Sequence, residues 1–119
     1  MKYYSLNHNS KPTLFQDAVK RGLAPDRGLY FPETITKLPN TFFKEIENMS
    51  ITEMAYKVIK PYVGNQIKKE KLIEIIEETL DFDFPIVKIT ENIASLELFQ
   101  GPTLAFKDVG ARFMARCLG

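Results

Sequence analysis

Two segments in the middle of the chain carry apolar residues at helical spacing. Between residues 51 and 62 these residues recur every three or four positions, which predicts an amphipathic helix with Ile51, Met54, Ala55, Val58, Ile59 and Tyr62 on one side. Ser50 and Glu53 stand three residues apart at its start, the spacing of a capping box. After a turn at Gly64, the segment KKEKLIEIIEETL predicts a second helix whose apolar stripe is Leu72, Ile73, Ile76 and Leu80.

The first third of the chain predicts short strands around one short helix. KYYSL, near the start, is short and rich in aromatic residues, as strands are. Pro12 suits the first position of a helix and Gly22 the position just past its end, so residues 12–22 predict a helix with Leu14, Phe15, Ala18 and Val19 on one face. The apolar group at 29–31 lies among glycine and proline, which predicts a turn and a brief extended segment.

The last third predicts a hairpin followed by a helix. PIVKI and ASLELF flank Glu91 and Asn92, a pattern typical of two short strands joined by a tight turn. Gly101 and Pro102 end the second strand, and Thr103 is a candidate cap for a helix whose close-packing face holds Phe106, Val109, Gly110, Phe113, Met114 and Cys117. Gly110 would let another backbone approach that face. The whole pattern predicts an α/β protein of the α-rich α+β kind.

Composition and charge exclude several classes of protein. The formal net charge is only +1, from 16 basic and 15 acidic residues mixed along the chain, so no basic surface for nucleic acid or anionic lipid is expected. No segment approaches the roughly 20 apolar residues of a membrane span. One histidine, His8, and one cysteine, Cys117, form neither a metal-ligand cluster nor an internal disulfide. We therefore expect one soluble, cytoplasmic domain with no metal and no nucleic-acid or membrane partner.

One lysine stands where electrostatics disfavours it. Lys107 falls in or near the first turn of the last predicted helix, where the partial positive charge of the helix end favours a neutral amine over an ammonium group. Burial beside Leu104 and Phe106 would act in the same direction, and a neutral lysine amine attacks carbonyl groups. The position alone also fits an ordinary solvated lysine, so spacing leaves both interpretations open.

Two stretches resemble one enzyme family. The segment LELFQGPTLAFKDVGARFMA, residues 96–115, is similar to the lysine segment of the threonine synthases of bacteria and yeast, which use pyridoxal 5'-phosphate. GLAPDRGLYFPE, residues 22–33, resembles a turn near the start of the same enzymes, although Arg27 stands where many relatives have glycine. The resemblance implies a fold-type II enzyme, with an N-terminal domain at 1–95 and the start of a cofactor-binding domain at 96–119.

The resemblance also implies roles for single residues. Lys107 would form the Schiff base with pyridoxal 5'-phosphate and shuttle protons while O-phospho-L-homoserine and water become L-threonine and phosphate. Phe106 would lie near the cofactor ring, and Thr103 would offer a hydroxyl or backbone donor to the substrate. Asp108 is assigned to the helix start, where its negative charge is preferred.

The family's phosphate loop is not recognisable in this sequence. The six glycines are scattered, so no glycine-rich cradle for the cofactor phosphate can be built from them. We therefore expect an N-terminal fragment, truncated before the cofactor-binding domain is complete, inactive alone and partnered by the rest of the same polypeptide. Two alternatives stay open: a related fold-type II phospholyase, or a non-catalytic interaction domain that uses the apolar 106–117 face. An exposed face of this kind also favours artefactual self-association.

Overall fold

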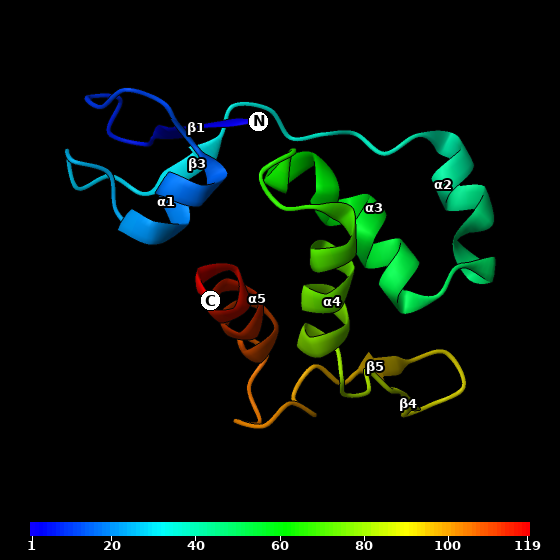
Figure 1. The fold of residues 1–119 in the computed structure, drawn as a ribbon. Coiled ribbons are helices and arrows are strands. Elements are labelled where there is room, and N and C mark those ends of the chain that lie inside the picture. Colours follow the sequence, from blue (N-terminus) through cyan, green and yellow to red (C-terminus); the bar gives the residue numbers. More distant parts are fainter.

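The computed structural model describes all residues from Met1 to Gly119. In chain order the elements are β1 Lys2–Ser5, β2 Thr13–Leu14, α1 Phe15–Arg21, β3 Tyr30–Pro32, α2 Asn40–Glu45, the 3₁₀ helix η1 Ile46–Asn48, α3 Ile51–Val63, α4 Lys69–Thr79, β4 Ile86–Lys88, β5 Ala94–Leu96 and α5 Asp108–Leu118. A small sheet and the first helix, α1, lie at one end, α3, α4 and α5 form the body, α2 lies beside α3, and a hairpin precedes α5 (Figure 1). This mixture of helices and short antiparallel strands confirms the predicted class.

The N-terminal sheet is antiparallel, in the order β2-β1-β3. It confirms the strand predicted at KYYSL and the extended segment near residue 30. The helix predicted from Pro12 begins three residues later, at Phe15, because Thr13 and Leu14 pair with β1 instead. Gly22 ends the helix as predicted, with a φ of 70° that glycine adopts without strain.

A single carboxylate organises the turn between α1 and β3. Asp26 accepts hydrogen bonds from the Ser5 hydroxyl at 2.6 Å, the Gly28 N–H at 3.0 Å and the Asn9 N–H at 2.9 Å. Gly28 is required here, since an added Cβ would lie 2.0 Å from the Ser5 Oγ. Arg27 has a φ of 66°, a left-handed conformation that glycine adopts without strain and that an arginine adopts only at some cost.

The helical body is built on α3 and α4. Ser50 accepts a hydrogen bond from the Glu53 N–H at 3.1 Å, which confirms the predicted cap of α3. Val63 of α3 and two residues of the predicted α4 stripe, Leu72 and Ile76, form the buried centre of the core. The partly buried side chains packed on it are Phe15, Ala55, Tyr56, Ile59, Ile67, Leu80 and Phe113. The core therefore draws on α1 and α5 as well.

Helix α2 and the 3₁₀ turn after it were not predicted. The helix has six residues, too few to show a helical repeat, and no side chain caps its start after Pro39. Its one buried residue, Phe42, has an edge-on contact with the neighbouring Phe43 ring, 5.3 Å between centroids. Tertiary packing of Phe42 rather than local sequence preference therefore forms this element.

Helix α5 is tied to the end of α4. The guanidinium of Arg112 donates to the Glu78 carbonyl oxygen at 2.5 Å and lies 2.6 Å from the Asp81 carboxylate. Arg116 pairs with the Glu78 side chain at 2.6 Å. Because Phe113 also packs on the core, the expectation of an exposed apolar face at 106–117 is wrong for the middle of that face, which the chain itself covers.

Much apolar surface is nevertheless uncovered. Only 12 of the 119 residues are buried, and the radius of gyration is 16.5 Å, against about 13.5 Å for a compact domain of this length. Exposed apolar residues of the last third include Ile86, Ile93, Leu104, Phe106 and Met114. So many exposed large apolar side chains are typical of a surface on which further protein packs. No helix has the length and apolar character that crossing a membrane requires.

The centre of the core generates a stability prediction. Leu72 is fully buried among Val63 and Ile76, so Leu72→Ala leaves a cavity and should lower the free energy of unfolding by about 2–5 kcal/mol. Urea denaturation of the chain measures this. Ile86→Ala, at a site 74% exposed, is the control and should change the free energy by less than about 0.5 kcal/mol. Equal losses in the two variants would contradict the placement of the core.

Candidate active site

Lys107 lies at the junction of a tight turn and the last helix. It is the N-cap residue of α5, with φ −65° and ψ −8°, and its carbonyl oxygen accepts the Ala111 N–H at 2.9 Å. The prediction that it stands at a helix start is therefore confirmed. Its side chain is exposed, and its amine has neither a hydrogen bond nor an ion pair. The Lys107 side chain is thus not engaged by any other group of residues 1–119.

The burial expected around this lysine is absent from residues 1–119. Leu104 is 75% and Phe106 68% exposed, and the Lys107 side chain between this turn and α5 is exposed as well. The prediction that these neighbours bury the amine is wrong for this chain, because short-range apolar residues cannot enclose a side chain without a second layer over them.

Asp108 is the buried charged residue of the site. It is 4% exposed, and its carboxylate accepts the Thr103 N–H at 2.9 Å and the Thr103 hydroxyl through the other oxygen. The Thr103 hydroxyl, helped by the Thr103 N–H and opposed by desolvation, lowers the pKa of the Asp108 carboxyl below its ordinary value. The carboxylate therefore stays charged and joins the first residue of α5 to the turn before it.

Thr103 does not have the predicted role of a helix cap. Helix α5 begins five residues later, at Asp108, and no side chain caps its start. Both of its donors, the hydroxyl and the backbone N–H, are bonded to Asp108. A donor contact from Thr103 to a substrate would need this pair to open, while the lone pairs of its hydroxyl oxygen remain available as acceptors.

The backbone of the turn is unusual at two positions. Leu104 has a φ of 56°, a left-handed conformation that costs a branched residue of order 1–3 kcal/mol and persists only where the surroundings enforce it. Gly101 is buried against Asp108: an added Cβ would lie 2.5 Å from the Asp108 Oδ2. The sequence indicated Gly101 only as a strand breaker, because a close approach to a residue seven positions later carries no local signal.

Gly110 does not have its predicted close neighbour. A Cβ added there would meet no atom within 4 Å, so nothing in residues 1–119 uses the space that this glycine leaves. Gly110 instead lines an apolar groove of about 440 Å³. The groove lies between α3, α4 and α5, and its other lining residues are Ile51, Met54, Ala55, Val58, Ile59, Ile76, Thr79, Leu80, Val109 and Phe113. It contains no titratable group and so offers no chemistry of its own.

Cys117, on the same helix, is not a nucleophile candidate. It is partly buried, and desolvation raises the pKa of its thiol to about 11. The reactive thiolate is therefore scarce at neutral pH. This agrees with its interpretation as a small packing residue.

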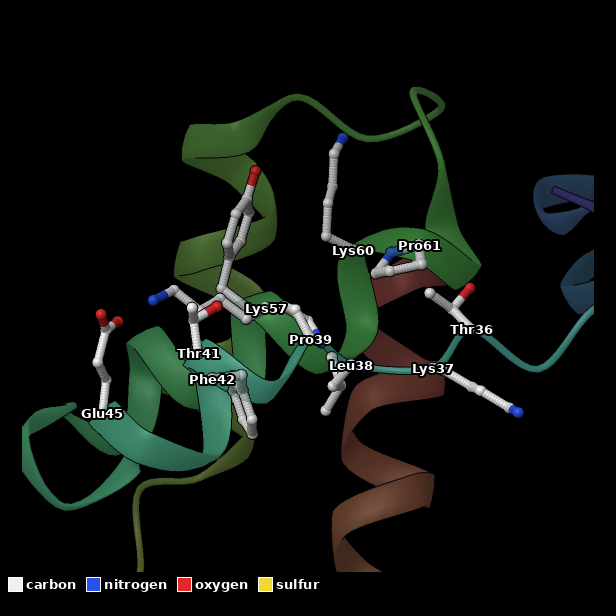
Figure 2. A pocket seen from close by; sticks show the side chains of 11 residues that line it. Thr36, Lys37, Leu38, Pro39, Thr41, Phe42, Glu45, Lys57, Lys60 and Pro61 are labelled. Atoms are coloured by element: carbon white, nitrogen blue, oxygen red, sulfur yellow. The ribbon is translucent and has the colours of Figure 1, made fainter.

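A second hollow, of about 350 Å³, lies between the segment before α2, α2 itself and α3 (Figure 2). Three lysines line it, but two are engaged in the fold: Lys60 donates to the Gly64 carbonyl oxygen at 2.6 Å, and Lys57 pairs with Glu53 at 3.2 Å. Figure 2 shows Lys37 pointing away from the other lining side chains. The hollow therefore lacks a free, convergent reactive group, and the turn at Lys107 is the stronger candidate site.

The two glycines of this region should respond oppositely to the same substitution. Gly101→Ala drives a methyl group into the Asp108 carboxylate and should lower the free energy of unfolding by about 1–3 kcal/mol. Gly110 lies inside α5, and the methyl group of Gly110→Ala would contact no other atom, so this variant should raise the free energy of unfolding by about 0.5–1 kcal/mol. Thermal and urea unfolding of the two variants provide the test, and a stabilising Gly101→Ala would contradict the contact.

The charge of Asp108 predicts a pH dependence of stability. Because the folded state lowers the pKa of this carboxyl from 3.8, its contribution is complete above the unfolded pKa and is lost as the pH falls through the folded value. Asp108→Asn should therefore be less stable than the wild type near about pH 6, with the difference shrinking below about pH 4. Glu91→Gln, at the hairpin turn, removes the same charge as a control. A pH-independent difference for Asp108→Asn would contradict the assignment.

Comparison with known proteins identifies the chain. Residues 2–80 match the family described as threonine synthase N terminus. The threonine synthase of Haemophilus influenzae is 38% identical over 99% of this chain, and that of Escherichia coli is 35% identical, also over 99%. The chain spans 27% and 28% of the length of these two relatives.

Solved structures agree over nearly the whole chain. The crystal structure of threonine synthase from Escherichia coli matches with a TM-score of 0.91 at 35% identity, covering 99% of this chain and 28% of that one. A structure of threonine synthase with bound pyridoxal phosphate, from Brucella melitensis, matches with a TM-score of 0.90 at 35% identity over 98% of this chain and 26% of that one. On sequence and fold together, the chain belongs to the threonine synthase family and matches its N-terminal region.

Proposed function

We propose that this chain is the N-terminal part of a threonine synthase, a pyridoxal-phosphate-dependent lyase that makes L-threonine and phosphate from O-phospho-L-homoserine and water. The observation that carries the proposal is the free, exposed amine of Lys107 at the start of α5. It stands in a chain whose fold matches a pyridoxal-phosphate-bound threonine synthase with a TM-score of 0.90.

The site fits the covalent attachment of the cofactor. Schiff-base formation needs a lysine side chain that an aldehyde can reach, and Lys107 is exposed with no carboxylate or carbonyl partner that would have to be displaced. Pyridoxal phosphate, when bound, supplies an electron sink for the carbon skeleton of the substrate. Lys107 Nζ would hold the cofactor and, once released from it, accept and return protons at the α- and β-carbons of the substrate.

Two neighbours of the lysine have supporting roles in this proposal. Phe106 presents an exposed ring beside Lys107, suited to contact with the flat face of the cofactor. Thr103 faces the substrate through the acceptor side of its hydroxyl, since both of its donors are bonded to Asp108. Neither residue carries the reaction by itself.

The rest of the site would come from the remainder of the same polypeptide. The glycines of this chain lie apart, and no turn among them gathers the backbone N–H groups that a phosphate cradle needs. The predicted boundary after residue 95 stays a prediction, as does the cytoplasmic location. We expect residues 1–119 alone to be inactive, because an exposed lysine without a phosphate cradle cannot orient the cofactor.

The alternative of a stand-alone interaction domain has less support. Its binding surface was to be the apolar 106–117 face, but Phe113 at the middle of that face packs on the core of this chain. The related phospholyase differs only in substrate, so the substrate assay below decides between it and threonine synthase.

The lysine assignment is tested in the intact enzyme. Lys107→Ala should abolish the visible absorbance of covalently held cofactor and lower kcat for threonine formation from O-phospho-L-homoserine by at least about 10³-fold. Lys88→Ala, on the exposed strand β4, removes a lysine elsewhere and serves as the control. Retention of the absorbance and of turnover in Lys107→Ala would refute the role of Lys107. Turnover of another phosphorylated amino acid in place of phosphohomoserine would favour the related phospholyase.

A further inference from the structure

The turn before the reactive lysine is held by contacts that the reaction itself does not explain. Asp108, the residue after Lys107, is almost fully buried although it is charged. Its two carboxylate oxygens reach back five residues to the N–H and the hydroxyl of Thr103. A buried carboxylate is costly unless it is hydrogen-bonded, so the fold maintains this arrangement against a desolvation penalty.

Two backbone hydrogen bonds close the same turn. The Leu104 N–H donates to the Gly101 carbonyl oxygen at 3.0 Å, and the Asp108 N–H donates to the Ala105 carbonyl oxygen at 3.0 Å. Between these two bonds Leu104 is held at a φ of 56° while its side chain is 75% exposed. The Leu104 side chain is too exposed for its packing to enforce that strained conformation. The constraints next to it are its own bond to Gly101 and the bonds from Thr103 to the Asp108 carboxylate.

Gly101 shows that the fit is tight. Its Cα faces the Asp108 side chain so closely that a methyl group would come within 2.9 Å of the Asp108 Cβ as well as touching the carboxylate. The carboxylate is therefore confined from one side by the Gly101 backbone and from another by Thr103. With its side chain confined in this way, the backbone of Asp108 is fixed as well, and so is the start of the adjacent residue, Lys107.

We propose that Asp108 is a positioning residue, whose carboxylate clamps the turn formed by residues 101–107 through Thr103 and thereby fixes where the Lys107 amine stands. The inference rests on the proposed function, because it assumes that Lys107 is the amine that carries the cofactor. Lys107 lies within the turn closed by the bond from the Asp108 N–H to the Ala105 carbonyl oxygen, and its own carbonyl oxygen accepts the Ala111 N–H, the first hydrogen bond of α5. Its backbone is thus fixed by the turn and by the helix, while its side chain is free.

The clamp predicts an effect on orientation rather than on substrate binding. A displacement of a reacting group by about 1 Å costs on the order of 10²-fold in rate. In the intact enzyme stripped of its cofactor, Asp108→Asn should therefore capture added pyridoxal 5'-phosphate on Lys107 about 10- to 100-fold more slowly than the wild type. The capture is followed by its visible absorbance and, after borohydride reduction, by the mass of the modified peptide. After loading, kcat should fall by a similar factor while KM for O-phospho-L-homoserine changes by less than about threefold.

A matched pair at the other end of the clamp separates the bond from general damage. Thr103→Val keeps the shape and the backbone N–H but loses the hydroxyl, and it should slow capture in the same direction as Asp108→Asn. Thr103→Ser retains the hydroxyl and should restore most of the rate that Thr103→Val loses. If Asp108→Asn fails to fold, the Val and Ser pair decides the question by itself.

Two controls assign each outcome. Arg116 lies on α5, as Asp108 does, but away from the turn, and it pairs with Glu78 of α4. Arg116→Ala breaks that pair, so it should lower stability and leave the rate of cofactor capture unchanged. The proposal is overturned if Thr103→Val captures the cofactor at the wild-type rate, or if Arg116→Ala slows capture as much as Asp108→Asn does. Lys107→Ala tests the assumption separately, because covalent capture of the cofactor by that variant would contradict the proposed function. If Lys107→Ala no longer captures the cofactor while Thr103→Val captures it at the wild-type rate, the proposed function stands and only the clamp is wrong.

Discussion

The hydrogen bonds from Thr103 to the buried Asp108 carboxylate are the constraint on which the candidate site depends. They join the first residue of α5 to a turn that would otherwise be a loose link after the hairpin. The turn contains Leu104 in a left-handed conformation, which is unfavourable unless other contacts stabilise it. In our proposal the hydrogen bonds to the Asp108 carboxylate stabilise the turn, and they thereby position Lys107 between the turn and the helix.

This local order would be of little use if α5 moved freely, and the contacts of Arg112 together with the packing of Phe113 on the core hold the helix in place. Arg112 bonds to the last-turn carbonyl of α4 at Glu78 and to Asp81, and its guanidinium lies 5.7 Å from the centre of the Phe82 ring. The Arg112 side chain is 19% exposed, so the arginine end of this ion pair is shielded from solvent, whereas the Asp81 side chain is 57% exposed. The reactive turn is therefore attached to the same helical core that carries the N-terminal sheet.

The apolar surface outside this core has a coherent interpretation. The hairpin β4–β5, the turn at 101–107 and the groove between α3, α4 and α5 are all rich in exposed apolar side chains. In relatives that are three to four times longer, the same fold is one part of a larger enzyme. Surface of this kind is what a domain presents when further protein packs on it, which is consistent with our proposal that the site is completed by the remainder of the polypeptide.

The sequence by itself determined the features that local rules govern. The spacing of apolar residues located α3 and α4, the Ser50 cap and the Gly22 helix end followed from side-chain chemistry, and the hairpin followed from two branched segments around a turn. The family resemblance at residues 96–115 singled out Lys107. Local rules failed where a distant contact outweighed them, as at Thr13 and Leu14, which pair with β1, and at α2, which forms around a buried Phe42. Only the tertiary structure decided that Asp108 bonds to Thr103 next to Gly101 and that the Lys107 side chain is exposed. The reason is that packing, which no local sequence pattern encodes, determines which groups meet in a folded turn and what covers them.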